Sequence, residues 1–430
     1  MKLIIKSVLS FVLICIIVLS SFACNTISSK TNSLNNVSYK PNNGHRLEKE
    51  TSKKMSLSAY KIFDVLKDEA NGENFVISPL SIYMAFALLD YIGDEEVKKE
   101  VSEFLNLAEE DILNTGKVFE YINRTKTDDD GKTLSKVNLT NSIWMDKDQG
   151  YTYNQEVLDK MAELLYCYAY ETPFAKDNKT ANNDIRKFVK NNTNGLIDRD
   201  FELSKETLFA LINTLYFKDS WKSNGDDLRT ENKTFYANSQ EIICEFLNGE
   251  YVSGIAAIND IASTMYSNTV TGYRLHFIVP NEGHTLDEAM SYENLSNLMF
   301  ISHTPVDEIS EIDYSYYTRV IFPSFNVKSS IDLKDVLIKK NMFNHTFTIY
   351  DSDLVDTPLS VSQVIHDAIL KVDKKGIEGA AVTIIANKAE SAFEQKIVYY
   401  DFLVDKPFGF ILSTYDGVVL FMGEINNPTK

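Results

Sequence analysis

The alternation of apolar and polar positions divides the chain into a helix-rich first half and a strand-rich second half. Apolar residues recur at helical spacing over residues 56–68, 156–168 and 182–190. Ser78 and Pro79 open a further, very apolar helix, because serine caps a helix start and proline fits its first turn. The pattern therefore predicts a block of helices before residue 208.

Strand-like runs dominate the rest of the chain. Residues 208–217, LFALINTLYF, form an almost unbroken apolar run, which predicts a strand buried on both faces with Asn213 in its middle. Similar runs predict strands at 137–145, 272–280, 318–327, 360–373, 396–403, 408–414 and 418–424. With no repeat and no internal linker, one α+β domain over residues 52–430 is the simplest interpretation.

The first 51 residues do not fit this pattern. Two lysines precede an apolar run that is short for a bilayer span, as in a secretory signal. The run ends in SFAC, which resembles a bacterial lipobox, although serine departs from the commoner leucine. We expect a lipoprotein signal peptide at 1–23, lipidation of Cys24 and a flexible polar tether at 24–51. An ordinary cleaved signal and an uncleaved anchor are the alternatives.

Charge and cysteine content narrow the compartment and the partners. The formal net charge is −18, and removal of residues 1–23, with Lys2 and Lys6 as their only charges, would make it −20. Nucleic acid is therefore excluded as an expected partner. Cys167 and Cys244 are too few for a disulfide framework in an exported protein, so we expect two small buried hydrophobes.

Signatures of catalysis and metal binding are missing from the sequence. It contains no GxSxG elbow, HExxH motif, Walker loop or CxxC pair. The six histidines show no metal-ligand spacing. We therefore expect no enzyme activity, no cofactor and no metal, with a carboxylate-based enzyme as a distant alternative.

Six segments, in matching order, resemble the serpins, a family of serine protease inhibitors and non-inhibitory relatives. The resemblance covers residues 55–428. The matching segments are NFVISPLSI (74–82), LINTLYFKDSW (211–221), FPSF (322–325), SQVIHDA (362–368), KPF (406–408) and LFMGEINNP (420–428).

The resemblance implies an α+β fold with a large, mostly antiparallel central sheet, two smaller sheets, about nine helices and an exposed reactive-centre loop at about 374–396. It also implies a monomeric extracellular inhibitor of a serine, or cysteine, protease. The protease cuts the loop and forms an acyl-enzyme, and the cut loop then enters the central sheet and deforms the protease. A non-inhibitory binding or structural protein is the alternative.

The stretch DKKGIEGAAVTIIANKAESAF at 373–393 mixes small residues, which suit a loop, with β-branched residues, which suit a strand. On the family's spacing, alternation turns Ile377, Gly379, Ala381, Thr383 and Ile385 inward, so no charge needs burial. A surface loop that never inserts is the alternative. The expected hinge comprises Lys375, Gly376, Ile377, Glu378, Gly379, Ala380, Ala381, Val382 and Thr383.

The hinge departs from the family's pattern at several positions. Lys374 and Lys375 stand where an acidic residue is common, Ile377 replaces a threonine or serine, and Gly379 interrupts a run of alanines. The glycine adds backbone entropy that insertion must remove, which would slow trapping.

The same spacing places the reactive bond at Glu390–Ser391, with Lys388–Ala389 as second choice. The resemblance also implies a shutter, which is a cluster of polar residues beneath the place where the central sheet separates to admit the loop. It further implies a tryptophan near the point where the loop enters. The alternative is that all these residues are ordinary core residues. These positions are Ser78, Ser81, Asn213, His366 and Trp221. Residues 250–271 match the family least, and we expect a protease exosite or a local rearrangement there.

Overall fold

The computed structural model describes residues 27–39, 46–112, 114–127, 133–222, 227–238, 240–303, 314–343, 347–378 and 396–430. Several sequence-based sites lie outside these residues: Cys24, the hinge from Gly379 to Thr383, and both expected reactive bonds, Glu390–Ser391 and Lys388–Ala389.

The largest sheet of the described residues has nine strands, most of them antiparallel. Its main path runs β1 (Asn32–Ser33), β5 (Cys167–Thr172), β4 (Thr133–Asp146), β6 (Phe209–Ser220), β17 (Gly376–Ile377), β16 (Leu359–Asp373) and β14 (Phe325–Asp332). Two more strands pair at its margins, β3 (Thr125–Thr127) on β4 and β15 (Thr348–Ile349) on β16.

Two smaller sheets complete the β-structure. One runs β10 (Ala257–Ile258), β11 (Ala262–Asn268), β12 (Arg274–Pro280), β19 (Phe408–Ser413), β20 (Val419–Ile425) and β2 (Phe75–Ile77). The other runs β18 (Lys396–Leu403), β13 (Tyr314–Pro323), β8 (Gln240–Asn248) and β7 (Arg229–Ala237), with β9 (Val252–Ser253) paired to β13.

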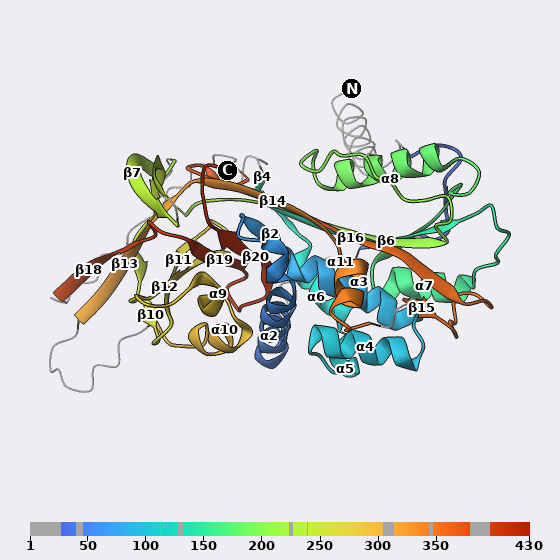
Figure 1. Cartoon of the computed structure of the whole chain (residues 1–430), viewed down its shortest axis with the longest axis horizontal. Coiled ribbons are helices and arrows are strands. Elements are labelled where there is room, and N and C mark those ends of the chain that lie inside the picture. The colour runs from blue at the N-terminus through green and yellow to red at the C-terminus, as the bar shows by residue number, and fades with distance from the viewer. Residues whose placement is uncertain are drawn as a thin grey trace, which may run out of the picture.

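Helices cover both faces of the central sheet, with α8 on one face and α3, α6, α7 and α11 on the other (Figure 1). The helices of the described residues are α2 (Lys49–Leu66), a 3-10 turn η1 (Lys67–Ala70), α3 (Pro79–Ile92), α4 (Glu95–Leu105), α5 (Glu109–Ile112), α6 (Thr115–Ile122), α7 (Gln155–Leu164), α8 (Asn178–Asn192), α9 (Leu286–Ala289), α10 (Tyr292–Leu298) and α11 (Leu333–Lys339). None of these described helices combines the length and apolarity that a bilayer span requires.

The expected α+β fold is confirmed: a large central sheet, two smaller sheets and about nine helices. The start of α3 shows how local sequence sets the element. The Ser81 backbone N–H donates to the Ser78 hydroxyl at 3.2 Å, and Pro79 occupies the first turn. Burial on both faces also holds for β6, whose residues are all buried except Asn213 and Lys218, which are half-buried.

Among the element boundaries that differ from the sequence-based prediction, two are set by sheet pairing. The helix predicted over 156–168 ends at Leu164, because Cys167 begins β5, which pairs in parallel with β4 from Asn141 onward. The strand predicted over 318–327 is two strands, β13 and β14, separated at Ser324. Sheet pairing decided both boundaries.

The tether expected at 24–51 is packed on the domain over residues 27–39. Within this segment β1 pairs with β5, and the Ser28 backbone N–H and hydroxyl donate to the buried carboxylate of Asp184 on α8 at 3.0 and 2.6 Å. The ring of Tyr39 stacks on Phe119 at 5.6 Å. Polar contacts of this kind leave no trace in a hydrophobic pattern. Helix α2 begins at Lys49, inside the expected tether.

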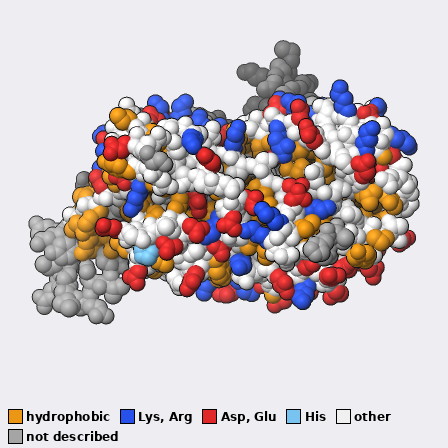
Figure 2. All heavy atoms as spheres, viewed as in Figure 1, with side chains coloured by type: hydrophobic (Ala, Val, Ile, Leu, Met, Phe, Trp, Pro, Cys, Tyr) orange, Lys and Arg blue, Asp and Glu red, His pale blue; other side chains and the backbone are white. Residues whose placement is uncertain are grey.

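Strands β13 and β18 extend from one end of the molecule as a parallel ribbon (Figure 1). Hydrophobic side chains gather at this end of the surface (Figure 2). The exposed ones on β18 are Ile397, Tyr399, Tyr400 and Leu403. An edge strand with this composition is open to pairing with another chain.

Candidate functional site: the hinge and the opening of the central sheet

Strands β6 and β16 lie side by side at one end of the central sheet and separate toward the other. Their parallel pairing runs from Phe209 with Val361 to Ile212 with Ile365 and stops there. Beyond a gap, the short strand β17 lies between them. The two strands therefore pair with each other at one end, are separated by β17 at the other, and are not paired with each other in between.

The strand β17, which separates β6 from β16, is the start of the expected hinge. After Asp373 the chain turns at residues 374 and 375 and returns as β17, with Gly376 opposite Asp373 and Ile377 opposite Val372. On its other side β17 pairs with Ser220 and Asp219 of β6. The first two residues after the turn therefore already form a strand of the central sheet.

The two residues of β17 fit this position in different ways. Ile377 is fully buried in the main core beneath the sheet, the same side that Val372 faces. Gly376 lies against the backbone of β6, where an added Cβ would overlap the carbonyl oxygen of Asp219 and lie 2.8 Å from the Cα of Ser220. Only glycine fits there without displacing β6.

Glu378 marks where the strand ends. Its φ of +60° is left-handed, and its backbone N–H donates to the Lys371 carbonyl at 2.7 Å. Its side chain accepts a hydrogen bond from the Tyr216 hydroxyl at 3.1 Å, while Oε2 is buried without a partner. Burial raises the pKa of the Glu378 carboxyl above its ordinary value, so the ionised form is disfavoured here.

Trp221 and Leu228 hold the turn. The Trp221 indole N–H donates to the Asp373 carbonyl at 2.6 Å, and the Leu228 backbone N–H donates to the Lys374 carbonyl at 2.8 Å. Within the turn, the Lys375 backbone N–H donates to the Asp373 carboxylate at 2.9 Å. The Trp221 side chain is buried, and it also positions the hinge.

Three of the shutter residues meet below the point where β6 and β16 separate. The Ser78 backbone N–H donates to Nε2 of His366 at 3.0 Å, and the Ser78 hydroxyl caps α3 through Ser81. Burial lowers the pKa of the His366 imidazole to about 4. The neutral ring is therefore the folded form, and stability is lost as the pH falls from about 6.5 toward 4.

Asn213 lies one residue beyond Ile212, the last residue of β6 that pairs with β16, but no hydrogen bond joins Asn213 to His366. Its amide donates instead to Oδ1 of Asn141 at 3.2 Å, and its own Oδ1 is buried without a partner. Asn141 in turn donates to the Met84 carbonyl of α3 at 3.3 Å. Sequence reasoning missed Asn141, although it is a polar residue inside a predicted strand, the signal that drew attention to Asn213.

The path ahead of the hinge is nearly filled. A cleft of about 10 Å³ lies between the separated strands, with room for at most one water. Its walls come from both strands, from the segment that follows α8, from the hinge and from β20: Thr193, Leu196, Ile197, Leu215, Phe217, Ile369, Leu370, Lys371, Glu378 and Phe421. A longer inserted strand requires this segment to move.

Metal chemistry finds no support in the described part of the chain, where no group of three or more histidine, cysteine or acidic side chains is placed to hold an ion.

A family model described as "Serpin (serine protease inhibitor)" matches residues 53–428. The chain belongs to the serpin family. Human neuroserpin is 27% identical over 391 residues, covering 85% of this chain and 89% of neuroserpin. A serpin-like protein of Thermococcus kodakarensis is 26% identical over 372 residues, covering 85% and 84% of the two chains.

Solved serpin structures share the fold. Tengpin, a thermophilic serpin crystallised in its native state, superposes with a TM-score of 0.71 at 19% identity, covering 91% of this chain and 97% of tengpin. The complex of thyroxine-binding globulin with thyroxine gives a TM-score of 0.70 at 19% identity, covering 89% and 100%. The serpin fold therefore includes a chain that binds a small ligand.

Proposed function

We propose that this serpin is a monomeric inhibitor that traps a serine, or cysteine, protease as a covalent complex. The observation that supports the proposal is the hinge: at the start of the expected reactive-centre loop, β17 is a strand of the central sheet with Ile377 in the core. A hinge built this way can extend into the open middle of the sheet.

The proposed reaction follows from the position of the bond. The protease serine attacks the carbonyl carbon of Glu390, the amine of Ser391 leaves with the proton, and Glu390 remains joined to the protease as an ester. The ester stays connected to the sheet through β17. As the loop inserts, it pulls the protease along and distorts its active site before water can hydrolyse the ester.

Incubation with a panel of serine and cysteine proteases tests the proposal. We expect an SDS-stable complex of serpin and protease. Clean cleavage in the loop with no complex formed by any protease would contradict inhibition and support a non-inhibitory binding protein. The mass of the released C-terminal fragment identifies the reactive bond, and cleavage at Glu390–Ser391 releases residues 391–430.

A matched pair of loop variants tests insertion itself. Counting from the buried Ile377, alternation turns Thr383 inward and Val382 outward. Thr383→Arg would place a charge in the core, so the protease should escape and the serpin be consumed as a substrate. Val382→Arg should still trap the protease. Equal trapping by both variants would show that the loop does not insert in this register.

We also propose that the protein acts outside the cell, tethered to the surface through lipidated Cys24. The lipobox-like sequence and the charged, apolar start of the chain support this. Labelling with a radioactive fatty acid should mark the protein and spare Cys24→Ala. Release of unlabelled protein into the medium would instead support an ordinary signal peptide.

A further inference from the structure

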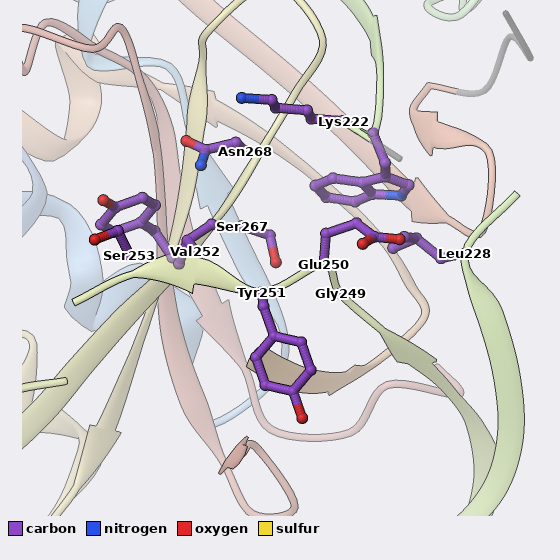
Figure 3. A pocket seen from close by; sticks show the side chains of 11 residues that line it. Lys222, Leu228, Gly249, Glu250, Tyr251, Val252, Ser253, Ser267 and Asn268 are labelled. Carbon is purple, nitrogen blue, oxygen red and sulfur yellow. The ribbon is translucent and has the colours of Figure 1, made fainter. Parts of the chain in front are cut away.

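A pocket of about 380 Å³ lies beside the hinge turn, within the size range of small-molecule sites (Figure 3). The stretch at 250–271, which matches the family least, supplies much of it. The lining residues are Trp221, Lys222, Leu228, Gly249, Glu250, Tyr251, Val252, Ser253, Tyr266, Ser267 and Asn268.

One polar group inside the pocket lacks a partner. Ser267, on β11, is only 3% exposed, and its hydroxyl makes no hydrogen bond. The space beside this hydroxyl depends on Gly249, where an added Cβ would lie 2.7 Å from Ser267 Oγ. Because buried hydroxyls in folded proteins are nearly always hydrogen-bonded, a ligand group is a fitting partner.

The walls and the rim of the pocket indicate the shape and the charge of the ligand. Trp221, Leu228, Val252 and Tyr266 are buried apolar or aromatic walls. At the rim, the exposed Lys222 and Glu250 carry opposite charges on different sides of the opening (Figure 3). The two charges balance, so the rim selects neither an anion nor a cation, and an aromatic wall favours a ring.

We propose that this pocket binds a small uncharged aromatic molecule with one hydrogen-bonding group, its ring against Trp221 and its polar group on Ser267 Oγ. Ligand binding here goes beyond protease inhibition and does not depend on it.

Calorimetric titration with 2-naphthol, which has a flat ring and one hydroxyl, tests the site. We expect saturable binding of one molecule per chain. Ser267→Ala should weaken it about fivefold, the value of one net hydrogen bond. The control is Thr264→Val, which removes another buried, unpaired hydroxyl of β11 outside the pocket and should change the affinity less than twofold. No saturable binding, or equal affinity in both variants, would overturn the proposal.

The anion 2-naphthalenesulfonate tests the charge argument on the same ring. The native protein should bind it more weakly than 2-naphthol. Glu250→Gln, at an exposed position, should strengthen sulfonate binding and leave 2-naphthol binding within twofold, because Lys222 is then the only charged side chain among the described residues that line the pocket. Tighter binding of the sulfonate by the native protein, or no response to Glu250→Gln, would contradict an uncharged ligand.

Discussion

Glu378 illustrates how one residue sets the resting position of the hinge. Its carboxyl is desolvated against Tyr216, with one oxygen paired and one unpaired, and its backbone is left-handed. The residue before it is fully buried. The cost of desolvating this carboxyl opposes the docked hinge, while the burial of Ile377 favours it.

Glu378→Gln should raise the free energy of unfolding of the uncut protein at pH 8 by about 1 kcal/mol, since a neutral amide can accept the hydrogen bond from Tyr216 without the cost of a buried charge. Because the folded-state pKa of Glu378 is raised, protonation stabilises the native protein, and its stability relative to the variant should recover as the pH falls through that pKa. Melting at pH 8 and pH 4 measures both effects. Glu241→Gln, at an exposed position of β8, is the control and should change neither value. A constant difference at both pH values would contradict this account.

At the scale of elements, apolar patterning predicted β6 and β16, because these strands bury their side chains continuously or alternately. It missed β7 and β8, whose residues are mostly exposed or half-buried, and it also missed β11. It could not predict β17. Two residues are too few for a periodic signal, and their strand state depends on pairing both with Val372, just before the turn, and with Ser220, which lies far away in sequence. The docked segment at 27–39 was missed for a similar reason, since its hold on Asp184 is polar and long-range.

Gly376→Ala should release β17 from the sheet, because its Cβ would overlap the backbone of Asp219. Hydrogen exchange should then accelerate at the amides of Ile377 and Glu378. Gly272→Ala is the control: its φ of +95° is also unfavourable for alanine, but no atom lies within 4 Å of the added Cβ. It should lower stability without faster exchange at the hinge. Equal exchange rates in both variants would contradict the steric role of Gly376.

At the scale of the whole molecule, β6 and β16 of the uncut protein do not pair with each other in the middle of the central sheet, and the proposed mechanism places a new strand there after cleavage. The expected shutter residues came from the resemblance to the serpins, and of these only Asn213 also stood out as a polar residue inside an apolar run. The hydrogen bonds of the shutter could not be predicted from the sequence. The amide of Asn213 donates to Asn141 and not to His366, because the register of β4 against β6 places Asn141 opposite Asn213.

Cleavage of the loop should raise the melting temperature by about 10 °C or more, because a new strand adds hydrogen bonds and core burial to a cooperative fold. Calorimetry before and after limited proteolysis measures this. Thr383→Arg, cut in the same way, should gain much less. An unchanged melting temperature in the cut wild-type protein would exclude insertion.

The docked hinge also has a kinetic consequence. When a strand adds to a sheet, the first contact is slow because it closes a loop of chain. Each later contact costs little entropy because the neighbouring residue is already in register. Gly376 and Ile377 have made that first contact before any protease arrives. If the loop inserts as proposed, we expect insertion to need no nucleation step, and its rate to depend on how fast residues 193–197, which line the cleft ahead of the hinge, move aside.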